Sequence, residues 1–275
     1  MNIDNLIKKA REEKISLNLI FKEYLHSVIL DYFFRKGLFD TLVFQGGTAI
    51  RFFYQGVRYS EDLDFVIKGE KKKSFSPDNI RRKLESISSY IEKTIPIVKN
   101  SKFKIQKEEE LIGRYLLSSE IEVLNINDRT RIEIGFVPSY TDKVYFLYNE
   151  YLTFPPVVIV ESAKEILSDK IVAFGGRNYL KGRDIWDIYF LSDTVHLKID
   201  ENTREMVEKK ISDYRLEKSR FLKKLKENLD ILKERGEEIL NIEMRRFLPY
   251  RYQKMFRNQY KDICNRVGEI FKDLK

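Results

Sequence analysis

Two carboxylates stand on alternate residues of the segment Ser-Glu-Asp-Leu-Asp-Phe, at Asp62 and Asp64. If this segment is a strand, both side chains project to the same side, while Leu63 and Phe65 face the core. Neighbouring carboxylates repel each other unless a cation lies between them. Mg²⁺ suits such a pair, because it commonly takes one or two protein carboxylates and completes its shell with water and phosphate oxygens. The pair is a candidate metal site, although the same alternation also occurs on the solvated face of an edge strand.

Two glycines, Gly46 and Gly47, follow an apolar run at residues 42–44 and precede the aspartates. This order predicts a strand, a tight turn and a short helix that begins at Thr48. Glycine lets the backbone approach a phosphate closely, and the unpaired N–H groups at a helix N-terminus favour an anion. The segment can therefore cradle a phosphate chain, or it can be a plain turn.

Arg58 and Ser60 lie between this helix and the aspartates, and each permits two interpretations. Arg58 can contact a triphosphate or pack against Asp62. The Ser60 hydroxyl can touch phosphate or simply shape the turn.

Further candidates lie downstream on segments of regular pattern. Glu133 stands between two apolar residues of a predicted strand, where it can complete a metal site or form a cross-strand salt bridge. Lys170 lies on a helix that opens with the capping-box pattern Ser-x-x-Glu, and a helical lysine is usually solvated. On the next helix Arg183 and Asp184 can form a structural pair, and Asp187 can orient Lys170.

The four motifs occur in one order between residues 40 and 192: the glycine pair, Asp-x-Asp, the apolar–Glu–apolar strand, and a lysine helix followed by Arg-Asp-x-x-Asp. This order resembles the nucleotidyltransferase fold of the polymerase-beta type. The fuller string Gly-Gly-Thr-Ala-Ile-Arg, then Arg-Tyr-Ser-Glu-Asp-Leu-Asp-Phe, resembles the AbiEii/AbiGii family of toxin nucleotidyltransferases. The resemblance implies an α/β (α+β) fold with a small mixed or antiparallel sheet flanked by helices, and a helical C-terminal part.

The resemblance also implies a reaction. A hydroxyl attacks the α-phosphorus of an NTP in line, pyrophosphate leaves, and two Mg²⁺ (or Mn²⁺) ions stabilise the attacking and leaving oxygens. The implied acceptor is RNA, with the tRNA 3′ end as one acceptor, and a cognate antitoxin is encoded alongside. Asp62, Asp64 and Glu133 would hold metal and, with Lys170, form the catalytic set. The implied nucleotide-binding residues are Gly46, Gly47, Thr48, Arg58, Ser60, Lys170, Arg183, Asp184 and Asp187.

Two other functions stay open at this point. A nucleotidyltransferase of this kind can modify a protein or a small molecule, and the scaffold can survive as a nucleotide- or RNA-binding module without catalysis. The carboxylates together with Lys170 argue against the second of these. Salt dependence of RNA binding would separate an RNA-modifying enzyme from one that modifies other acceptors.

The composition frames these hypotheses. The chain has 275 residues and a net charge of +8, which favours a polyanionic partner. Residues 201–275 hold 20 Lys and Arg against 14 Asp and Glu, so 20 − 14 = +6 of that charge is C-terminal. One cysteine and two distant histidines disfavour a disulfide or a zinc site. A polar start and the lack of a long apolar run predict a cytoplasmic protein without a membrane segment.

The periodicity predicts the elements that position these residues. The clearest break is Pro155-Pro156, which divides a nucleotidyltransferase core with N-terminal helices, residues 1–155, from a helical domain, residues 156–275. Helices are expected at residues 4–13, 16–36, 48–54, 78–95, 162–176 and 184–192 and from about 200 onward, with strands at 42–44, 62–67, 102–109, 114–124, 129–137 and 157–160.

Overall fold

The computed structural model describes residues 3–273, so the polar start at Met1 and Asn2 lies outside the described range. The chain forms two compact units. The first runs to Phe53 and continues from Tyr59 to Glu161, and the second joins Tyr54–Arg58 to the segment that begins at Ser162. The sequence predicts a boundary after residue 155, whereas the structural division follows Glu161.

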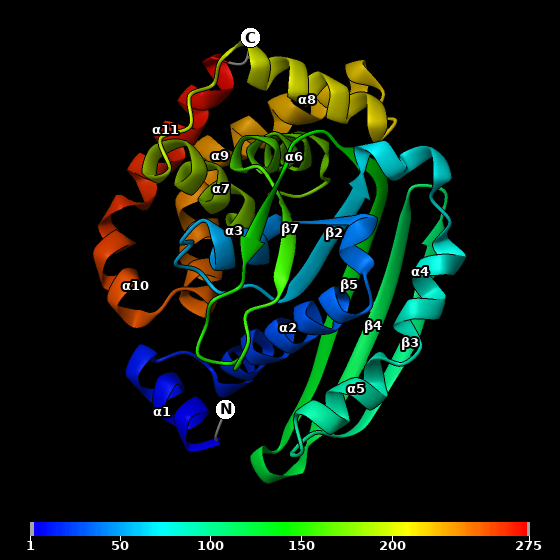
Figure 1. The fold of residues 1–275 in the computed structure, drawn as a ribbon. Coiled ribbons are helices and arrows are strands. Elements are labelled where there is room, and N and C mark those ends of the chain that lie inside the picture. The colour runs from blue at the N-terminus through cyan, green and yellow to red at the C-terminus, as the bar shows by residue number, and fades with distance from the viewer. Residues whose placement is uncertain (1–2, 274–275) are drawn as a thin grey trace. The chain divides into compact units, whose positions relative to one another are not determined.

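The first unit is built on a seven-stranded sheet of order β3-β4-β5-β2-β1-β7-β6 (Figure 1). Four neighbouring pairs are antiparallel, and two, β1 with β7 and β2 with β5, are parallel. The expected mixed or antiparallel sheet flanked by helices is thus confirmed, in the form of a mixed sheet that is mostly antiparallel. The strands are β1 (Leu42–Gln45), β2 (Asp62–Lys68), β3 (Lys99–Glu109), β4 (Ile112–Ile121), β5 (Ile126–Ser139), β6 (Asp142–Phe146) and β7 (Val157–Glu161).

Alternation along β2 and β5 gives the sheet one apolar face. Leu63 and Phe65 on β2 and Ile132 and Ile134 on β5 are fully buried. Helix α2 (Leu17–Arg35) crosses this face (Figure 1) and stacks Phe33 on Phe65 with ring centroids 4.7 Å apart. Each such side chain contributes roughly 1.5–3 kcal/mol when it leaves water. Burial of this face therefore sets which side of β2 the intervening aspartates occupy.

Two expectations about this unit are wrong. The helix predicted over residues 78–95 is two shorter helices, because the chain turns at residues 85–86 so that both Leu84 and Ile87 are buried. Strand β6 was not predicted, because its five residues carry no clear alternation and are ordered by pairing with β7. The helices of this unit are α1 (Ile3–Glu13), α2, α3 (Gly46–Phe53), α4 (Pro77–Leu84) and α5 (Ile87–Thr94).

The second unit confirms the expected helical C-terminal part. Over its described residues it contains α6 (Ala163–Gly176), α7 (Gly182–Tyr189), α8 (Glu201–Asp213), α9 (Lys218–Phe247), α10 (Tyr250–Phe256) and α11 (Tyr260–Asp273).

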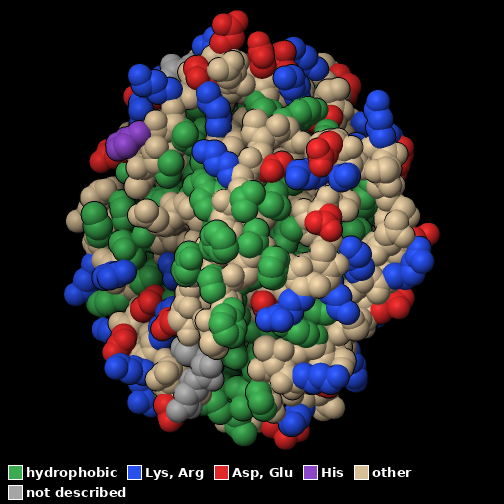
Figure 2. Space-filling model, viewed as in Figure 1, with side chains coloured by type: hydrophobic (Ala, Val, Ile, Leu, Met, Phe, Trp, Pro, Cys, Tyr) green, Lys and Arg blue, Asp and Glu red, His purple; other side chains and the backbone are tan. Residues whose placement is uncertain are grey.

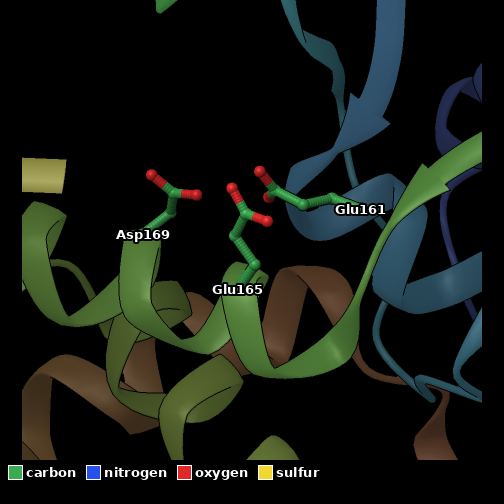
Figure 3. A group of neighbouring side chains, drawn as sticks. All are labelled: Glu161, Glu165 and Asp169. Atoms are coloured by element: carbon green, nitrogen blue, oxygen red, sulfur yellow. The ribbon is translucent and has the colours of Figure 1, made fainter. Parts of the chain in front are cut away.

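A buried ion-pair cluster joins α6 to α8. Glu165 and Asp169 lie one turn apart on α6 and project in one direction; Glu161, at the end of β7, precedes them (Figure 3). The ammonium of Lys210, a residue with 0% exposure, lies 2.6 Å from Glu165 and 3.0 Å from Asp169. One buried lysine cation therefore pairs with both carboxylates, which indicates a structural role for the pair.

Helices that are both long and apolar enough to cross a membrane are absent from the described part of the chain.

Candidate active site

The register between β2 and β5 brings the three predicted metal ligands together. Asp64 is paired directly with Glu133 across the parallel strands, and Asp62 with Arg131. Paired residues of neighbouring strands project to the same face of a sheet, so all three carboxylates share the face opposite Phe65. The Asp62 and Glu133 side chains are 32% and 30% exposed, which leaves their oxygens accessible to a ligand.

Two guanidinium groups flank these carboxylates. Arg114 on β4 donates from Nε to Oε2 of Glu133 at 2.7 Å, and Nη1 of Arg131 lies 3.8 Å from Oδ2 of Asp62. Both arginines are more than a third exposed, so each pair contributes at most about 1 kcal/mol. Pairs of that strength can give way to a divalent cation. Three accessible carboxylates on one face form a donor set that fits Mg²⁺ or Mn²⁺.

The backbone of Gly46 makes room for Asp64. Gly46 has φ of +79°, a region that L side chains rarely adopt, and an added Cβ would lie 2.3 Å from Oδ2 of Asp64. Helix α3 begins at this residue, two positions before the expected start at Thr48. The Thr48 hydroxyl donates to the Asp62 carbonyl at 2.6 Å, so the helix start is tied to the aspartate strand. Gly47, which lies between Gly46 and Thr48 in the chain, is also buried.

We expect Gly46→Ala to lower both stability and activity. The methyl group would be strained at this φ, by about 1–3 kcal/mol, and would displace the Asp64 carboxylate. Thermal unfolding and nucleotidyl transfer would be measured for this variant and for Gly135→Ala, whose added Cβ would meet its nearest neighbours at 3.5 Å. Equal behaviour of the two variants would show that Asp64 does not need the glycine.

Three residues that sequence reasoning did not select also shape this site. Arg114 and Arg131 are brought next to the carboxylates by strand pairing, which the sequence does not reveal, although Arg131 lies within the Glu133 motif. His26 on α2 is fully buried, and its Nε2 lies 3.2 Å from the carbonyl of Glu61, next to Asp62. Burial, reinforced by nearby Lys22, lowers the pKa of His26 to about 3, so the ring is neutral and can donate to that carbonyl. His26 therefore holds Glu61, the residue before β2, from the apolar face of the sheet.

In the second unit, the other predicted residues form a compact charged cluster. Lys170 on α6 lies 2.8 Å from Asp187 and 3.5 Å from Asp184, both on α7. Arg58 donates to both oxygens of Asp187, at 2.6 Å from Nε and 2.5 Å from Nη2. Arg177 Nε approaches Asp184 at 3.0 Å as an ion pair without hydrogen-bond geometry. Two carboxylates thus hold three cations.

The two ends of this cluster differ in exposure. Arg58 is only 3% exposed, so its guanidinium is committed to Asp187. Burial alone would raise the pKa of Asp187, but the charges and hydrogen bonds of Arg58 and Lys170 outweigh it and hold that pKa at about 2. Of the three cations, Arg177 is the most exposed, with 35% of its side chain accessible. Lys170 follows with 14%. The arrangement orients Lys170 and leaves a small part of its side chain exposed to solvent.

Acid should weaken the fold through Asp187. Its pKa lies below the ordinary value of 3.8, so the stabilising charge is fully present above pH 3.8 and is lost as pH falls towards 2. The expected loss over this window is roughly 2 kcal/mol. Unfolding free energies at pH 4 and pH 2 would measure it, and Asp187→Asn should show a smaller difference between the two. An equal difference in the variant would assign the acid sensitivity to other carboxylates.

The remaining predicted residues lie at the edges of these groups. Ser60 is half-buried in the loop before β2. Arg183 donates its backbone N–H to Glu243 at 3.0 Å, and its guanidinium lies 4.9 Å from the centre of the Phe247 ring. The first unit therefore carries Gly46, Gly47, Thr48, Ser60, Asp62, Asp64 and Glu133, and the second carries Arg58, Lys170, Arg183, Asp184 and Asp187.

Comparisons with known proteins identify a shared fold and a family. JHP933 from Helicobacter pylori is 16% identical, with a TM-score of 0.53, and the match covers 94% of this chain and 93% of that one. A "putative nucleotidyltransferase" from H. pylori is also 16% identical, with a TM-score of 0.56, covering 95% and 99%. At this identity the two structures show a common fold. A search among curated proteins finds no match. The family described as "Nucleotidyl transferase AbiEii toxin, Type IV TA system" matches residues 28–269, and the chain belongs to that family.

Proposed function

We propose that this nucleotidyltransferase transfers a nucleoside monophosphate from an NTP to an RNA acceptor, with the tRNA 3′ end as the favoured site. Membership of a family of type IV toxin nucleotidyltransferases supplies the reaction class. The observation that carries the proposal is the placement of Asp62, Asp64 and Glu133 on one face of the sheet, beside a glycine that leaves room for Asp64. Such a donor set is suited to metal-assisted phosphoryl chemistry.

Each group of the first unit has a distinct role in this proposal. Asp62 and Asp64 would hold two Mg²⁺ or Mn²⁺ ions, and Glu133 would be the third ligand or accept the proton of the acceptor hydroxyl. When bound, such ions stabilise the charge on attacking and leaving oxygens. The N–H groups at the start of α3, from Gly46 to Thr48, would face phosphate oxygens, since that end of a helix favours an anion.

The charged cluster of the second unit would bind the triphosphate. Lys170 is the candidate phosphate ligand, because a compact ammonium ion is a strong partner for phosphate oxygens. Asp184 and Asp187 would fix its position, and Arg58 would act on the nucleotide only through Asp187, given its burial. Arg183 and Ser60 would border the bound nucleotide.

The family also implies an antitoxin partner. We propose that a cognate antitoxin is encoded alongside this toxin, that both act in the cytoplasm, and that transfer to RNA arrests growth in its absence.

A transfer assay tests the proposal directly. Purified protein, Mg²⁺ and each α-labelled NTP in turn would be incubated with total RNA, and an Asp62→Asn/Asp64→Asn protein would serve as the control. Label in a tRNA-sized band with the wild-type protein alone is the expected result, and it would also identify the donor base. Label in protein or in a small product would instead favour the alternative acceptors, and no transfer despite NTP binding would favour a non-catalytic scaffold.

A further inference from the structure

The charge of the C-terminal region is concentrated in one segment. Residues 244–261, here called the basic segment, contain six Lys and Arg and no Asp or Glu. The remainder of residues 201–275 holds 20 − 6 = 14 cations against 14 acids, so its net charge is zero. The whole C-terminal excess of +6 therefore lies in 18 consecutive residues. We infer that the basic segment is the surface that binds the sugar–phosphate backbone of the RNA acceptor, an inference that rests on the proposed function.

The cations of the segment face solvent. It covers the last turn of α9, all of α10 and the start of α11, and α10 itself has no buried residue. Figure 2 shows basic side chains interleaved with hydrophobic ones along the left margin, where Figure 1 places α10. The six exposed cations are Arg245, Arg246, Arg251, Lys254, Arg257 and Lys261.

These cations differ from those elsewhere on the same helices because no acidic residue stands among them in the sequence. Earlier on α9, where acids are interspersed, Lys224 pairs with Glu227 at 2.9 Å and Arg235 with Glu238 at 3.1 Å. Five cations of the basic segment form no ion pair with any described residue: Arg245, Arg251, Lys254, Arg257 and Lys261. Their charge is left available to an external anion.

Aromatic side chains alternate with these charges. Arg251 lies over the Tyr252 ring at 4.6 Å and Lys254 over the Tyr250 ring at 4.9 Å. Tyr250 is 38% exposed, and Met255 on the same helix is 59% exposed, while the Tyr252 ring is half-buried. An exposed ring among cations suits a single-stranded nucleic acid, because a base can stack on the ring while phosphates meet the charges. An acidic protein would use the charges but not the Tyr250 ring.

The basic segment adjoins the nucleotide-binding cluster within the same unit. The Phe256 ring of α10 packs edge-on against Trp186 of α7, with centroids 5.0 Å apart. At the end of α9, Phe247 lies under the guanidinium of Arg183. Helix α7 also carries Asp184 and Asp187, which hold Lys170. RNA on the basic segment would therefore lie next to the element that positions the triphosphate ligand.

The test compares two triple variants that remove the same charge. Arg251→Gln/Lys254→Gln/Arg257→Gln neutralises the centre of the basic segment, and Lys226→Gln/Lys233→Gln/Arg235→Gln neutralises three exposed cations earlier on α9. RNA affinity would be measured by fluorescence anisotropy with a labelled tRNA across a range of salt concentrations. Each lost phosphate contact should reduce the slope of log affinity against log salt by about 0.7–0.9, so the first variant should lose about 2.

The expected result is at least a tenfold weaker RNA affinity and a higher KM for RNA in the first variant only. Its kcat at saturating RNA and its NTP affinity should stay unchanged, because the substituted residues touch neither the carboxylates nor Lys170. Wild-type RNA affinity and salt slope in the first variant, or an equal loss in both variants, would overturn the inference. Equal competition by polyglutamate and by tRNA would overturn it in favour of an acidic protein partner.

Failure of the proposed function gives a different pattern. If the wild-type protein transfers nucleotide to a non-RNA acceptor and binds no tRNA at any salt concentration, both proposals fail together. If the wild-type protein transfers nucleotide to RNA and the first variant matches it in KM and affinity, only the basic-segment inference fails.

Discussion

Asp62→Asn and Asp64→Asn each reduce nucleotidyl transfer by about 10³-fold or more, in our expectation, while the protein stays folded. Asparagine keeps the shape of the side chain but loses the negative charge that a divalent cation requires. Neither aspartate is deeply buried, and the ion pair of Asp62 with Arg131 spans 3.8 Å, so its loss costs about 1 kcal/mol or less. Transfer activity should therefore be lost while the protein stays folded.

The measurement combines transfer rates with circular dichroism and thermal unfolding for each variant. Glu109→Gln is the matched control, because Glu109 is an exposed carboxylate at the edge strand of the same sheet, paired with Lys107 at 2.6 Å. It should leave both rate and stability near wild-type values. Unfolding of both aspartate variants would indicate a structural role for the pair, and full activity in either would remove that residue from the metal site.

Asp187→Ala should cause the largest loss of stability, about 3–5 kcal/mol. The Arg58 guanidinium is buried and donates twice to Asp187, so truncation of the carboxylate leaves an uncompensated charge in the interior. Lys170 loses its closer partner in the same step, at 2.8 Å, and keeps only Asp184 at 3.5 Å. Denaturant unfolding would measure the change, and activity should fall with it.

A double variant separates the structural effect from the functional one. Arg58→Met/Asp187→Leu replaces the buried pair by apolar side chains of similar size, a change that is often neutral or stabilising in other proteins. We expect it to recover most of the stability lost in Asp187→Ala but not the activity, because Lys170 would still lack its carboxylate. Recovery of activity together with stability would show that Asp187 serves only the fold.

The spacing of polar and apolar residues along the sequence determines much of this site. The spacing of Asp62 and Asp64 decides that both share a face once residues 62–65 form a strand, because side chains alternate at every residue. The apolar Leu63 and Phe65 then decide which face is buried. The helical C-terminal part also follows from periodicity along the chain. The order of the motifs, read directly from the sequence, resembles the family that matches residues 28–269.

Contacts between distant segments were decided by the tertiary structure alone. Glu133 is the direct partner of Asp64 only through the parallel register of β5 on β2, and Arg114 joins them from β4. Arg58 could equally have served Asp62 by its place in the sequence, yet its partner is Asp187, 129 residues away. The physical reason is that periodicity reports which face of an element is buried, whereas pairing register and buried ion pairs depend on which elements pack together.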